Sequence, residues 1–458
     1  MGKLPKTLFY NALAIALIGA LLVGCKETPQ IPEKPLLAEP LKDRKLSEVK
    51  LKELEEIPQD VSYFLRLKDR FSSFESEKKR FESLYFKAWN LTEDELNKFN
   101  LSWAFDAYKE GESYAENYAL YTQKFFDEMR DESNLAAYAS LNKKAVVTAH
   151  ADMRVFPTER ALLKDPNRAG EGFPFDYLQN STISANEPVL VTHYSKSKEW
   201  VYIVSSFALG WVRSDQVAFV EDSHAKKWQE AKQVKIVKEN QALHDANGRF
   251  LMNTRIGMNL PLIKEKQNSY IVLVTERDNR SVARYSSVEI SKDIGRVEFL
   301  EFNKENITMI FAEVTQSIYG WGGIYGQRDC SSTLRDIFAP FGIWLPRNSY
   351  DQAQVGNKVD VAKLDEKEKE AFILKDAVAF ETLLYKNGHI GLYVGEYNGR
   401  AIMFHNTWGI KTKRDGQESR IVVGKGVFTT LQFGSEIDAY KKEDDFLKNI
   451  ESINTLGR

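Results

Sequence analysis

The chain has 458 residues, which is longer than one compact core normally organises and favours roughly three or four domains. Its 63 basic and 65 acidic side chains leave a formal charge of -2 and no basic stripe, so nucleic acid is not an expected partner. A hydrophobic fraction of 43%, with 12% aromatic residues and only 13 prolines, excludes a disordered or collagen-like chain. The 2 cysteines and 6 histidines cannot form a disulfide framework, and neither cysteine lies at zinc spacing, so we expect no metal and no cofactor.

Residues 1–24 are predicted to be a signal peptide. Lysines precede an apolar run from Leu8 to Val23, which ends at a small residue followed by Cys25. The motif Leu22-Val23-Gly24-Cys25 resembles a bacterial lipobox, in which the cysteine is lipidated and becomes the new N-terminus. An uncleaved transmembrane helix is the alternative, but the apolar run is shorter than the ~20 residues that cross hydrocarbon. We therefore expect an extracytoplasmic protein that a lipid on Cys25 anchors to a membrane.

The residue after the predicted lipidation site bears on which membrane is involved. Lys26 stands where an aspartate retains lipoproteins in the inner membrane of many Gram-negative bacteria. In a Gram-negative organism we therefore expect the periplasmic face of the outer membrane. Export would leave Cys330 as the only thiol of the mature chain, and an unpaired cysteine in that compartment requires an explanation.

The next two segments are predicted to be a tether and a helical region. Residues 25–49 are polar and rich in proline, as expected for a tether. From Phe64 the apolar residues recur at spacings of three and four, which predicts an amphipathic helix that ends near Trp89. Residues 92–126 are also predicted to be helical. We assign residues 50–140 to a helical stabilising domain without chemistry of its own.

Short β-rich runs begin near Ala145 and are separated by polar turns. These patterns predict two consecutive small β-barrels, at residues 143–222 and 226–292. Residues 154–158, 173–181 and 210–212 look like parts of the bacterial SH3 barrels that accompany cell-wall peptidases. Such barrels host many functions, so this likeness alone does not define an activity.

The stretch around Cys330 predicts a nucleophile. Glycine-rich residues 319–323 precede Asp329-Cys330-Ser331-Ser332, and the apolar residues of 334–341 share one helix face. Cys330 is therefore predicted to lie in the first helical turn, where free N–H groups and the positive end of the helix dipole favour a thiolate and could hold an oxyanion. A buried core thiol is the alternative, because Cys330 lies four residues before Leu334 on the same apolar stripe. The helix pattern alone does not decide between them.

Two histidines on neighbouring strands favour the interpretation of Cys330 as a nucleophile over that of a core thiol. Residues 389–395 alternate, so His389 leaves the apolar face of its strand. Residues 400–405 alternate too, and a three-residue loop at Tyr397-Asn398-Gly399 would pair Phe404 with Leu392. This register brings His405 opposite Gly391 and onto the face of His389, at roughly 5–8 Å between Cβ atoms. A cysteine, a histidine base and a second polar group to orient it form a catalytic triad. The alternative is that both histidines are structural strand residues, which their shared glycine-lined face disfavours.

Three motifs together carry a family resemblance. Residues 329–332, 388–395 and 404–406 resemble the catalytic stretches of the NlpC family of papain-like cell-wall cysteine peptidases, within a domain at 300–440. The resemblance implies that Cys330 is the nucleophile, His389 the base and His405 the third residue. It also implies that substrate subsites are lined by Tyr319, Asp329, Ser331 and Ser349. Ser332 stands where many members have glycine.

The whole mature chain resembles γ-D-glutamyl-L-diamino acid endopeptidases. The resemblance implies an α+β multidomain fold with a helical N-terminal region, two small SH3-like barrels and a C-terminal papain-like domain. It implies as substrate a peptidoglycan stem peptide, with the first barrel partly closing the site around a free N-terminal L-alanine. One alternative is an inactive wall-binding lipoprotein, against which the intact triad argues. Another is a cysteine amidase or acyltransferase on the same fold.

Overall fold

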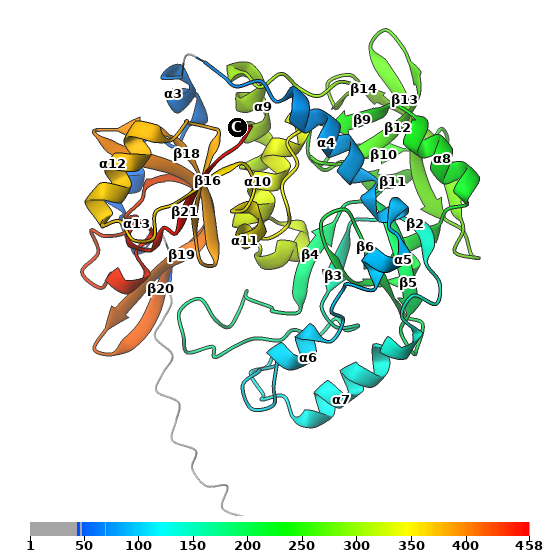
Figure 1. The fold of residues 1–458 in the computed structure, drawn as a ribbon, viewed down its shortest axis with the longest axis horizontal. Helices are drawn as coiled ribbons and strands as arrows, with labels where there is room; N and C mark the ends of the chain where they lie inside the picture. Colours follow the sequence, from blue (N-terminus) through cyan, green and yellow to red (C-terminus); the bar gives the residue numbers. More distant parts are fainter. Residues whose placement is uncertain (1–43, 46–47, 69, 458) are drawn as a thin grey trace, which may run out of the picture. The chain divides into compact units, whose positions relative to one another are not determined.

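The structure, a computed structural model, describes residues 44–45, 48–68 and 70–457. The predicted signal peptide, Cys25 and most of the predicted tether lie outside these residues. The described part of the chain belongs to one compact unit. Its order of elements confirms the expected fold class, with helices first, two small β-barrels next and a mixed α+β domain last (Figure 1). None of the helices in the described ranges is long and apolar enough to cross a membrane.

The N-terminal region consists of short helices. The single helix predicted from Phe64 to Trp89 is wrong, because one helix ends at Arg66 and the next begins at Glu75. Phe64 and Phe74 are buried in the same core cluster. The spacing of apolar residues does not distinguish one long helix from two short helices that pack in the same core. Residues 108–122 are not helical either, so the helical style predicted for 92–126 holds only in part. The helices are α2 (Lys52–Glu56), α3 (Val61–Arg66), α4 (Glu75–Tyr85), α5 (Glu93–Leu96), α6 (Trp103–Ala107) and α7 (Gln123–Glu132).

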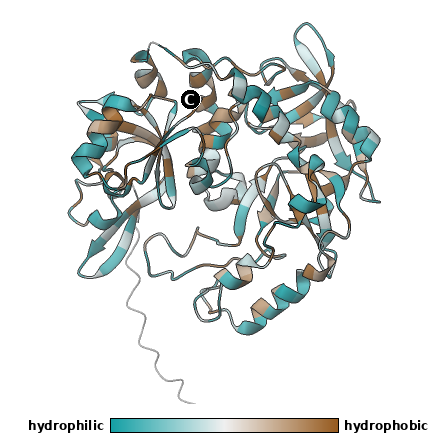
Figure 2. Cartoon of the chain, viewed as in Figure 1, coloured by the Kyte–Doolittle hydropathy of each residue, from teal (hydrophilic) through white to brown (hydrophobic). Residues whose placement is uncertain are grey.

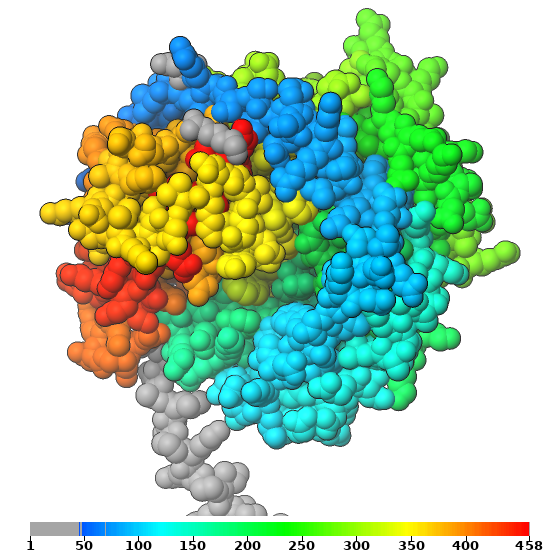
Figure 3. Space-filling model, in the orientation of Figure 1, coloured from blue at the N-terminus to red at the C-terminus, as the bar shows by residue number. Residues whose placement is uncertain are grey.

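This region connects the other domains. Phe81 and Tyr85 of α4 pack against Ala339 in the C-terminal domain. Trp89 donates its indole N–H to the carbonyls of Ala145 and Val189 in the first barrel, at 3.0 Å each. In Figure 3 the blue N-terminal residues accordingly lie between the yellow residues of the C-terminal domain and the green residues of the barrels.

The first barrel has strand order β4-β3-β7-β6-β5-β2-β8. A long loop, residues 155–178, joins β3 to β4. Neither β3 nor β4 was predicted, because both are short and contain polar residues among the apolar ones. The strands are β2 (Lys143–Val147), β3 (Ala151–Arg154), β4 (Gln179–Ile183), β5 (Pro188–Tyr194), β6 (Trp200–Val204), β7 (Leu209–Arg213) and β8 (Val217–Phe219).

The second barrel follows helix α8 (Asp222–Glu230), which is largely hydrophilic in Figure 2. Its main sheet has the order β14-β13-β12-β9-β15, and β10 and β11 form a separate hairpin. Strand β15 pairs with β9, so the barrel extends beyond its predicted end at residue 292. The strands are β9 (Gln233–Ile236), β10 (Ala242–His244), β11 (Phe250–Asn253), β12 (Asn259–Glu265), β13 (Ser269–Arg277), β14 (Ala283–Ser291) and β15 (Gly295–Arg296).

The C-terminal domain is built on a sheet of order β1-β20-β19-β18-β17-β21-β16. Strand β21 lies between β17 and β16, so the domain extends past its predicted boundary at residue 440. A local sequence pattern does not reveal that the chain returns to the sheet after residue 440. The strands are β1 (Arg44–Lys45), β16 (Asn357–Asp360), β17 (Thr382–Lys386), β18 (His389–Tyr397), β19 (Arg400–Arg414), β20 (Gln417–Thr430) and β21 (Ser452–Thr455).

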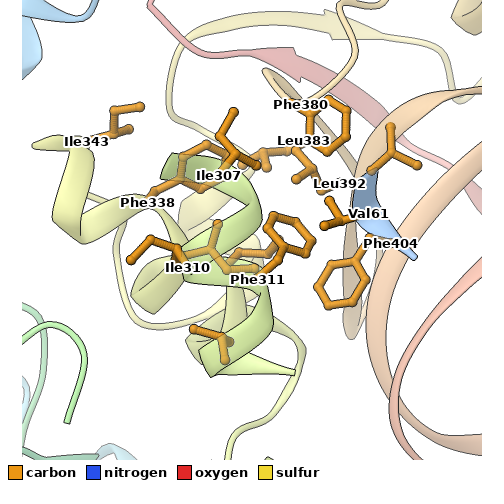
Figure 4. Packing of buried hydrophobic residues seen from close by; sticks show 14 of the residues in the cluster. Val61, Ile307, Ile310, Phe311, Phe338, Ile343, Phe380, Leu383, Leu392 and Phe404 are labelled. Atoms are coloured by element: carbon orange, nitrogen blue, oxygen red, sulfur yellow. The ribbon is translucent and has the colours of Figure 1, made fainter. Parts of the chain in front are cut away.

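Two helices pack on this sheet and form the largest core cluster. Phe311 of α9 lies edge-on to Phe404 of β19, with ring centroids 4.9 Å apart (Figure 4). Leu334 and Ile337 of α10 are fully buried in the same cluster, as their common helix face predicts. This packing fixes α10 against β18 and β19. The helices of the domain are α9 (Lys304–Val314), α10 (Cys330–Phe338), α11 (Ser349–Gln352), α12 (Glu366–Asp376) and α13 (Phe446–Asn449).

Candidate active site

Cys330 is the first residue of α10, in the first turn as the sequence predicts. Asp329 caps the helix, since its carboxylate accepts the backbone N–H of Ser332 at 2.8 Å and the Ser332 hydroxyl bonds the backbone N–H of Asp329 in return. Cys330 is 8% exposed and packs in the core cluster that also contains Leu334 and Ile390. The core-thiol alternative therefore describes the burial of Cys330 correctly, and the chemistry depends on what surrounds the sulfur.

The electrostatic surroundings of Cys330 correct one expectation. Burial and the neighbouring carboxylate of Asp329 raise the pKa of Cys330 to about 12, although the backbone N–H groups of Ile390 and Ser331 and the cation of Arg347 lower it. Burial of the sulfur therefore opposes the thiolate that the helix N-terminus was expected to favour. A neutral thiol needs a base to become a nucleophile.

The two predicted histidines form a hydrogen-bonded pair. His389 Nε2 and His405 Nδ1 are 2.8 Å apart. Phe446 lies edge-on to the ring of His389 and Phe433 to the ring of His405, at centroid distances of 5.8 and 5.9 Å. These aromatic contacts hold both imidazoles in place.

The hairpin that carries the pair differs from the predicted one. Tyr397 pairs with Arg400, so the loop is the two-residue turn Asn398-Gly399, with φ of 49° and 74°. The three-residue loop is therefore wrong. Positive φ at both central residues is typical of a type I′ turn, which asparagine and glycine favour.

A β-bulge nevertheless restores the predicted register at the site. The pairing shifts by one residue between Tyr393 and Gly395, and Leu392 pairs with Phe404 as expected. A Cβ placed on Gly391 would lie 3.3 Å from the Cβ of His405, which shows how closely these two residues approach. The bulge thus compensates for the one-residue shift in register that the shorter turn causes, and both imidazoles lie on one face of the sheet.

Both imidazoles are neutral in this environment. Burial, and to a smaller extent the cation of Lys386, lower the pKa of His389 to about 3. Burial, His389 and Lys386 hold the pKa of His405 well below its usual value. At neutral pH His389 therefore has a free lone pair on one ring nitrogen and can accept a proton.

A cavity of about 340 Å³ opens beside the histidines. The C-terminal domain contributes Tyr319, Trp321 and Trp408 to its wall, and the β3–β4 loop of the first barrel contributes Phe175 and Tyr177. The rings of Phe175 and Trp321 are edge-on, with centroids 5.2 Å apart. The first barrel therefore forms part of the wall of the cavity that contains His389 and His405.

The charged residues that line the cavity are mainly positive. They are Lys386, Lys411, Arg420 and Lys441, with Asp444 as a carboxylate among them. Lys386 donates to the backbone carbonyl of Asp444 at 2.9 Å, and Lys441 forms a 3.1 Å ion pair with the Asp444 side chain. A ligand with carboxylates suits this surface better than a cationic one. Within the described ranges, no group of three or more His, Cys, Asp or Glu residues is placed to hold a metal ion.

The structure brings three of the four predicted subsite residues to the first turn of α10 and its surroundings. Tyr319 is buried in the cavity wall, where burial and the nearby Cys330 raise its pKa. Asp329 and Ser331 flank Cys330 on either side. Ser349 instead begins α11, and Arg347, two residues earlier, reaches the site.

Arg347 is a residue that the sequence analysis missed. Its Nη2 donates to the Asp329 carboxylate at 2.7 Å, its Nη1 to the hydroxyl of Ser331 at 3.1 Å and its Nε to the hydroxyl of Ser181 in the first barrel at 2.7 Å. Burial raises the pKa of Asp329, but the charge and hydrogen bonds of Arg347 together with the hydrogen bonds from Ser332 outweigh it, so the pKa lies below its usual value. The sequence signal that could have found Arg347 is its place two residues before Ser349, a predicted subsite residue.

This arrangement defines a class of protein. A buried cysteine at the start of a helix, packed against a strand whose histidine is bonded to a second histidine, is the architecture of papain-like cysteine peptidases. Residues 316–421 match the model of the NlpC/P60 family, and residues 14–138 match that of the N-terminal stabilising domain found with it. Residues 161–213 match an SH3 domain of SH3b1 type and residues 221–267 one of SH3b2 type. Residues 316–421 are therefore a domain of the NlpC/P60 type, whose members are cell-wall cysteine peptidases.

One relative is similar to about half of the chain, and one solved structure is similar to most of it. A γ-D-glutamyl-L-lysine dipeptidyl-peptidase of Bacillus subtilis is 27% identical over 241 residues, which cover 49% of this chain and 72% of the relative. The solved structure of a novel NlpC/P60 endopeptidase from Photobacterium damselae subsp. piscicida superposes with a TM-score of 0.76 at 24% identity. That match covers 91% of this chain and 99% of the other, and at this identity it supports the fold alone.

Proposed function

We propose that this peptidoglycan hydrolase cleaves the amide bond between γ-D-glutamate and the diamino acid of stem peptides. Cys330 is the nucleophile, His389 the base and His405 the residue that orients the base. The observation that carries the proposal is the 2.8 Å bond between His389 and His405, in a cavity wall next to the strand residue Ile390 that contacts Cys330. The bond named for the Bacillus relative supports the choice of substrate.

The reaction begins with a neutral thiol and a neutral imidazole. His389 removes the proton from Cys330 as the sulfur attacks the carbonyl carbon of the γ-glutamyl amide, and N–H groups at the start of α10 stabilise the oxyanion. The imidazolium then donates its proton to the amine of the diamino acid, which leaves as the C–N bond breaks. Water, deprotonated by His389, attacks the thioester carbonyl and releases the γ-glutamyl product and the free thiol.

The first barrel limits the space available to the N-terminal end of the substrate. Phe175 and Tyr177 close one side of the cavity, and Arg347 links Ser181 of the same barrel to Asp329. We propose that this closure selects stem peptides with a free N-terminal L-alanine. Tyr319, Asp329 and Ser331 are the proposed subsite residues around it.

A defined set of stem peptides tests this function. The mature protein is incubated with peptides with and without the glycan, and with and without a free L-alanine, and the products are identified by mass spectrometry. Cleavage after γ-D-glutamate only in peptides with a free L-alanine supports the proposal. Release of an amide nitrogen elsewhere, or transfer of the acyl group to an added amine, favours the amidase or acyltransferase. Binding without any cleavage favours an inactive wall-binding protein.

We also propose that the chain is a lipoprotein anchored through Cys25 outside the cytoplasm. The support is the sequence of residues 1–26. Metabolic labelling with a radioactive fatty acid should label the wild type and leave Cys25→Ala unlabelled, and fractionation of a Gram-negative host should place the labelled protein in the outer membrane. Equal labelling of both proteins would contradict the assignment.

A further inference from the structure

A third polar side chain, Thr429, lies behind the two histidines. Thr429 is near the end of β20 and pairs with Met403 of β19, so its side chain points to the same face of the sheet as His405. Its hydroxyl oxygen lies 3.2 Å from His405 Nε2. Thr429 is fully buried and His405 is 4% exposed, so this bond is shielded from bulk water.

The direction of this bond follows from a second one. The Thr429 hydroxyl donates its proton to the backbone carbonyl of Thr430 at 2.9 Å. A hydroxyl has one proton, so towards His405 the oxygen of Thr429 acts as an acceptor. His405 Nε2 must then carry a hydrogen.

The proton positions on both imidazoles follow in turn. A neutral imidazole carries one N–H, so His405 Nδ1 is an acceptor when its Nε2 is protonated. The 2.8 Å bond between the histidines then requires His389 Nε2 to be the donor. The remaining nitrogen of His389, Nδ1, keeps its lone pair.

We infer that Thr429 is a positioning residue that sets the tautomers of His405 and His389, so that His389 Nδ1 is the base for the thiol. This inference rests on the proposed catalytic roles of Cys330 and His389. The opposite tautomer would place the proton of His389 on Nδ1 and leave its lone pair on Nε2, facing His405. His389 could not then accept the thiol proton on Nδ1 until both imidazoles had changed tautomer.

The strand end that carries Thr429 is itself held in place. The backbone N–H of Thr430 donates to the carboxylate of Glu53, from α2, and the N–H of Gly434 lies 3.4 Å from the same carboxylate. The Thr430 carbonyl that accepts from Thr429 is thus part of a fixed backbone segment. The direction of the Thr429 hydroxyl is therefore built into the fold.

The test compares Thr429→Val, which keeps the shape and loses the hydroxyl, with Thr429→Ser, which keeps the hydroxyl. Thr412→Val is the matched control, because Thr412 is equally buried in the same sheet and its hydroxyl bonds Ser419 at 2.7 Å. We expect kcat of Thr429→Val to fall about 10- to 100-fold with little change in KM, since part of the general-base contribution is lost. Thr429→Ser and Thr412→Val should stay within about threefold of the wild type.

Nitrogen NMR of histidine-labelled protein measures the tautomers directly. In the wild type, His389 and His405 should both show a protonated Nε2 and an unprotonated Nδ1, and in Thr429→Val the two forms should mix. A wild-type His389 protonated on Nδ1, or a Thr429→Val variant with unchanged tautomers and kcat, would overturn the inference. The wild-type spectrum does not depend on the substrate, so a protein that fails to cut stem peptides would refute the proposed function and leave this measurement decisive for Thr429.

Discussion

Arg347 and Asp329 form a buried ion pair of 2.7 Å at the first turn of the helix that carries Cys330. Both side chains are about nine-tenths buried, and Arg347 also bonds Ser181 of the first barrel. The pair therefore joins the barrel to the start of α10, beside the thiol.

Replacing Arg347 with alanine should destabilise the protein by about 3–5 kcal/mol, because the Asp329 carboxylate is left buried without its partner. Urea unfolding measures the change. Lys196→Ala is the control, since its ion pair with Asp131 is exposed and should contribute less than about 1 kcal/mol. Equal effects of the two substitutions would contradict the role given to Arg347.

His405→Ala should lower kcat by about 100- to 10,000-fold with a smaller effect on KM, because His389 loses the partner that orients it. His405→Asn should fall by less, since an amide oxygen can accept the bond from His389. His389→Ala should be at least as damaging as either. Steady-state kinetics on a stem peptide measure all three, and a His405→Ala variant as fast as the wild type would refute the triad.

Acid should destabilise the fold through its buried histidines. Burial lowers the pKa of His389 from 6.5 to about 3 and that of His405 in the same direction. Below pH 6.5 the unfolded chain therefore binds protons that the folded protein does not, so stability is present above this pH and decreases as the pH falls below it.

The measurement is the thermal midpoint at several pH values between 7 and 5. The loss should be smaller in His405→Asn, which lacks one of these groups, and the difference between the two proteins cancels the contribution of the carboxylates. A His405→Asn variant with the same pH slope as the wild type would show that His405 is not held neutral.

The wall that the first barrel contributes should affect substrate choice. Phe175→Ala removes a ring that contacts Trp321 and Trp408, which widens the cavity. We expect a higher KM for peptides with a free L-alanine and a weaker preference for them over extended peptides. Phe250→Ala, an exposed residue of the second barrel, is the control. Unchanged preference in Phe175→Ala would remove the barrel from the account of specificity.

The sequence allowed the order of domains and the main site residues to be predicted because their signals are local. The alternation of residues 389–395 and 400–405 placed both histidines on one face. The turn and the bulge were not predictable separately, since a two-residue turn with a bulge and a three-residue loop give the same pairing of Leu392 with Phe404. The breaks in the N-terminal helices were missed because they depend on contacts with a distant core.

Other features of the site depend on burial and on contacts between distant segments. Arg347 and Thr429 act through residues far away in sequence, and neither stands in a recognisable motif. The upward shift of the pKa of Cys330 was not foreseen because the helix N-terminus is visible in the sequence and the desolvation of the sulfur is not. The relative size of these two effects can be judged only from the packed structure.

Cys330 is the proposed nucleophile for γ-D-glutamyl amide cleavage. Removing the sulfur should abolish hydrolysis in Cys330→Ala and Cys330→Ser while the melting temperature hardly changes, because the small substitutions keep the packing at the first turn of α10. The His389–His405 bond does not involve the thiol and should persist in both variants.

Mass spectrometry of a stem peptide with a free L-alanine, after incubation with the wild type and with Cys330→Ala, tests this most directly. The wild type should release the γ-glutamyl dipeptide, and an acyl-enzyme, heavier by that dipeptide less one water, should accumulate on Cys330 when the reaction is quenched early. The Cys330→Ala protein should give neither. Release of the same dipeptide by Cys330→Ala at near the wild-type rate would contradict the account.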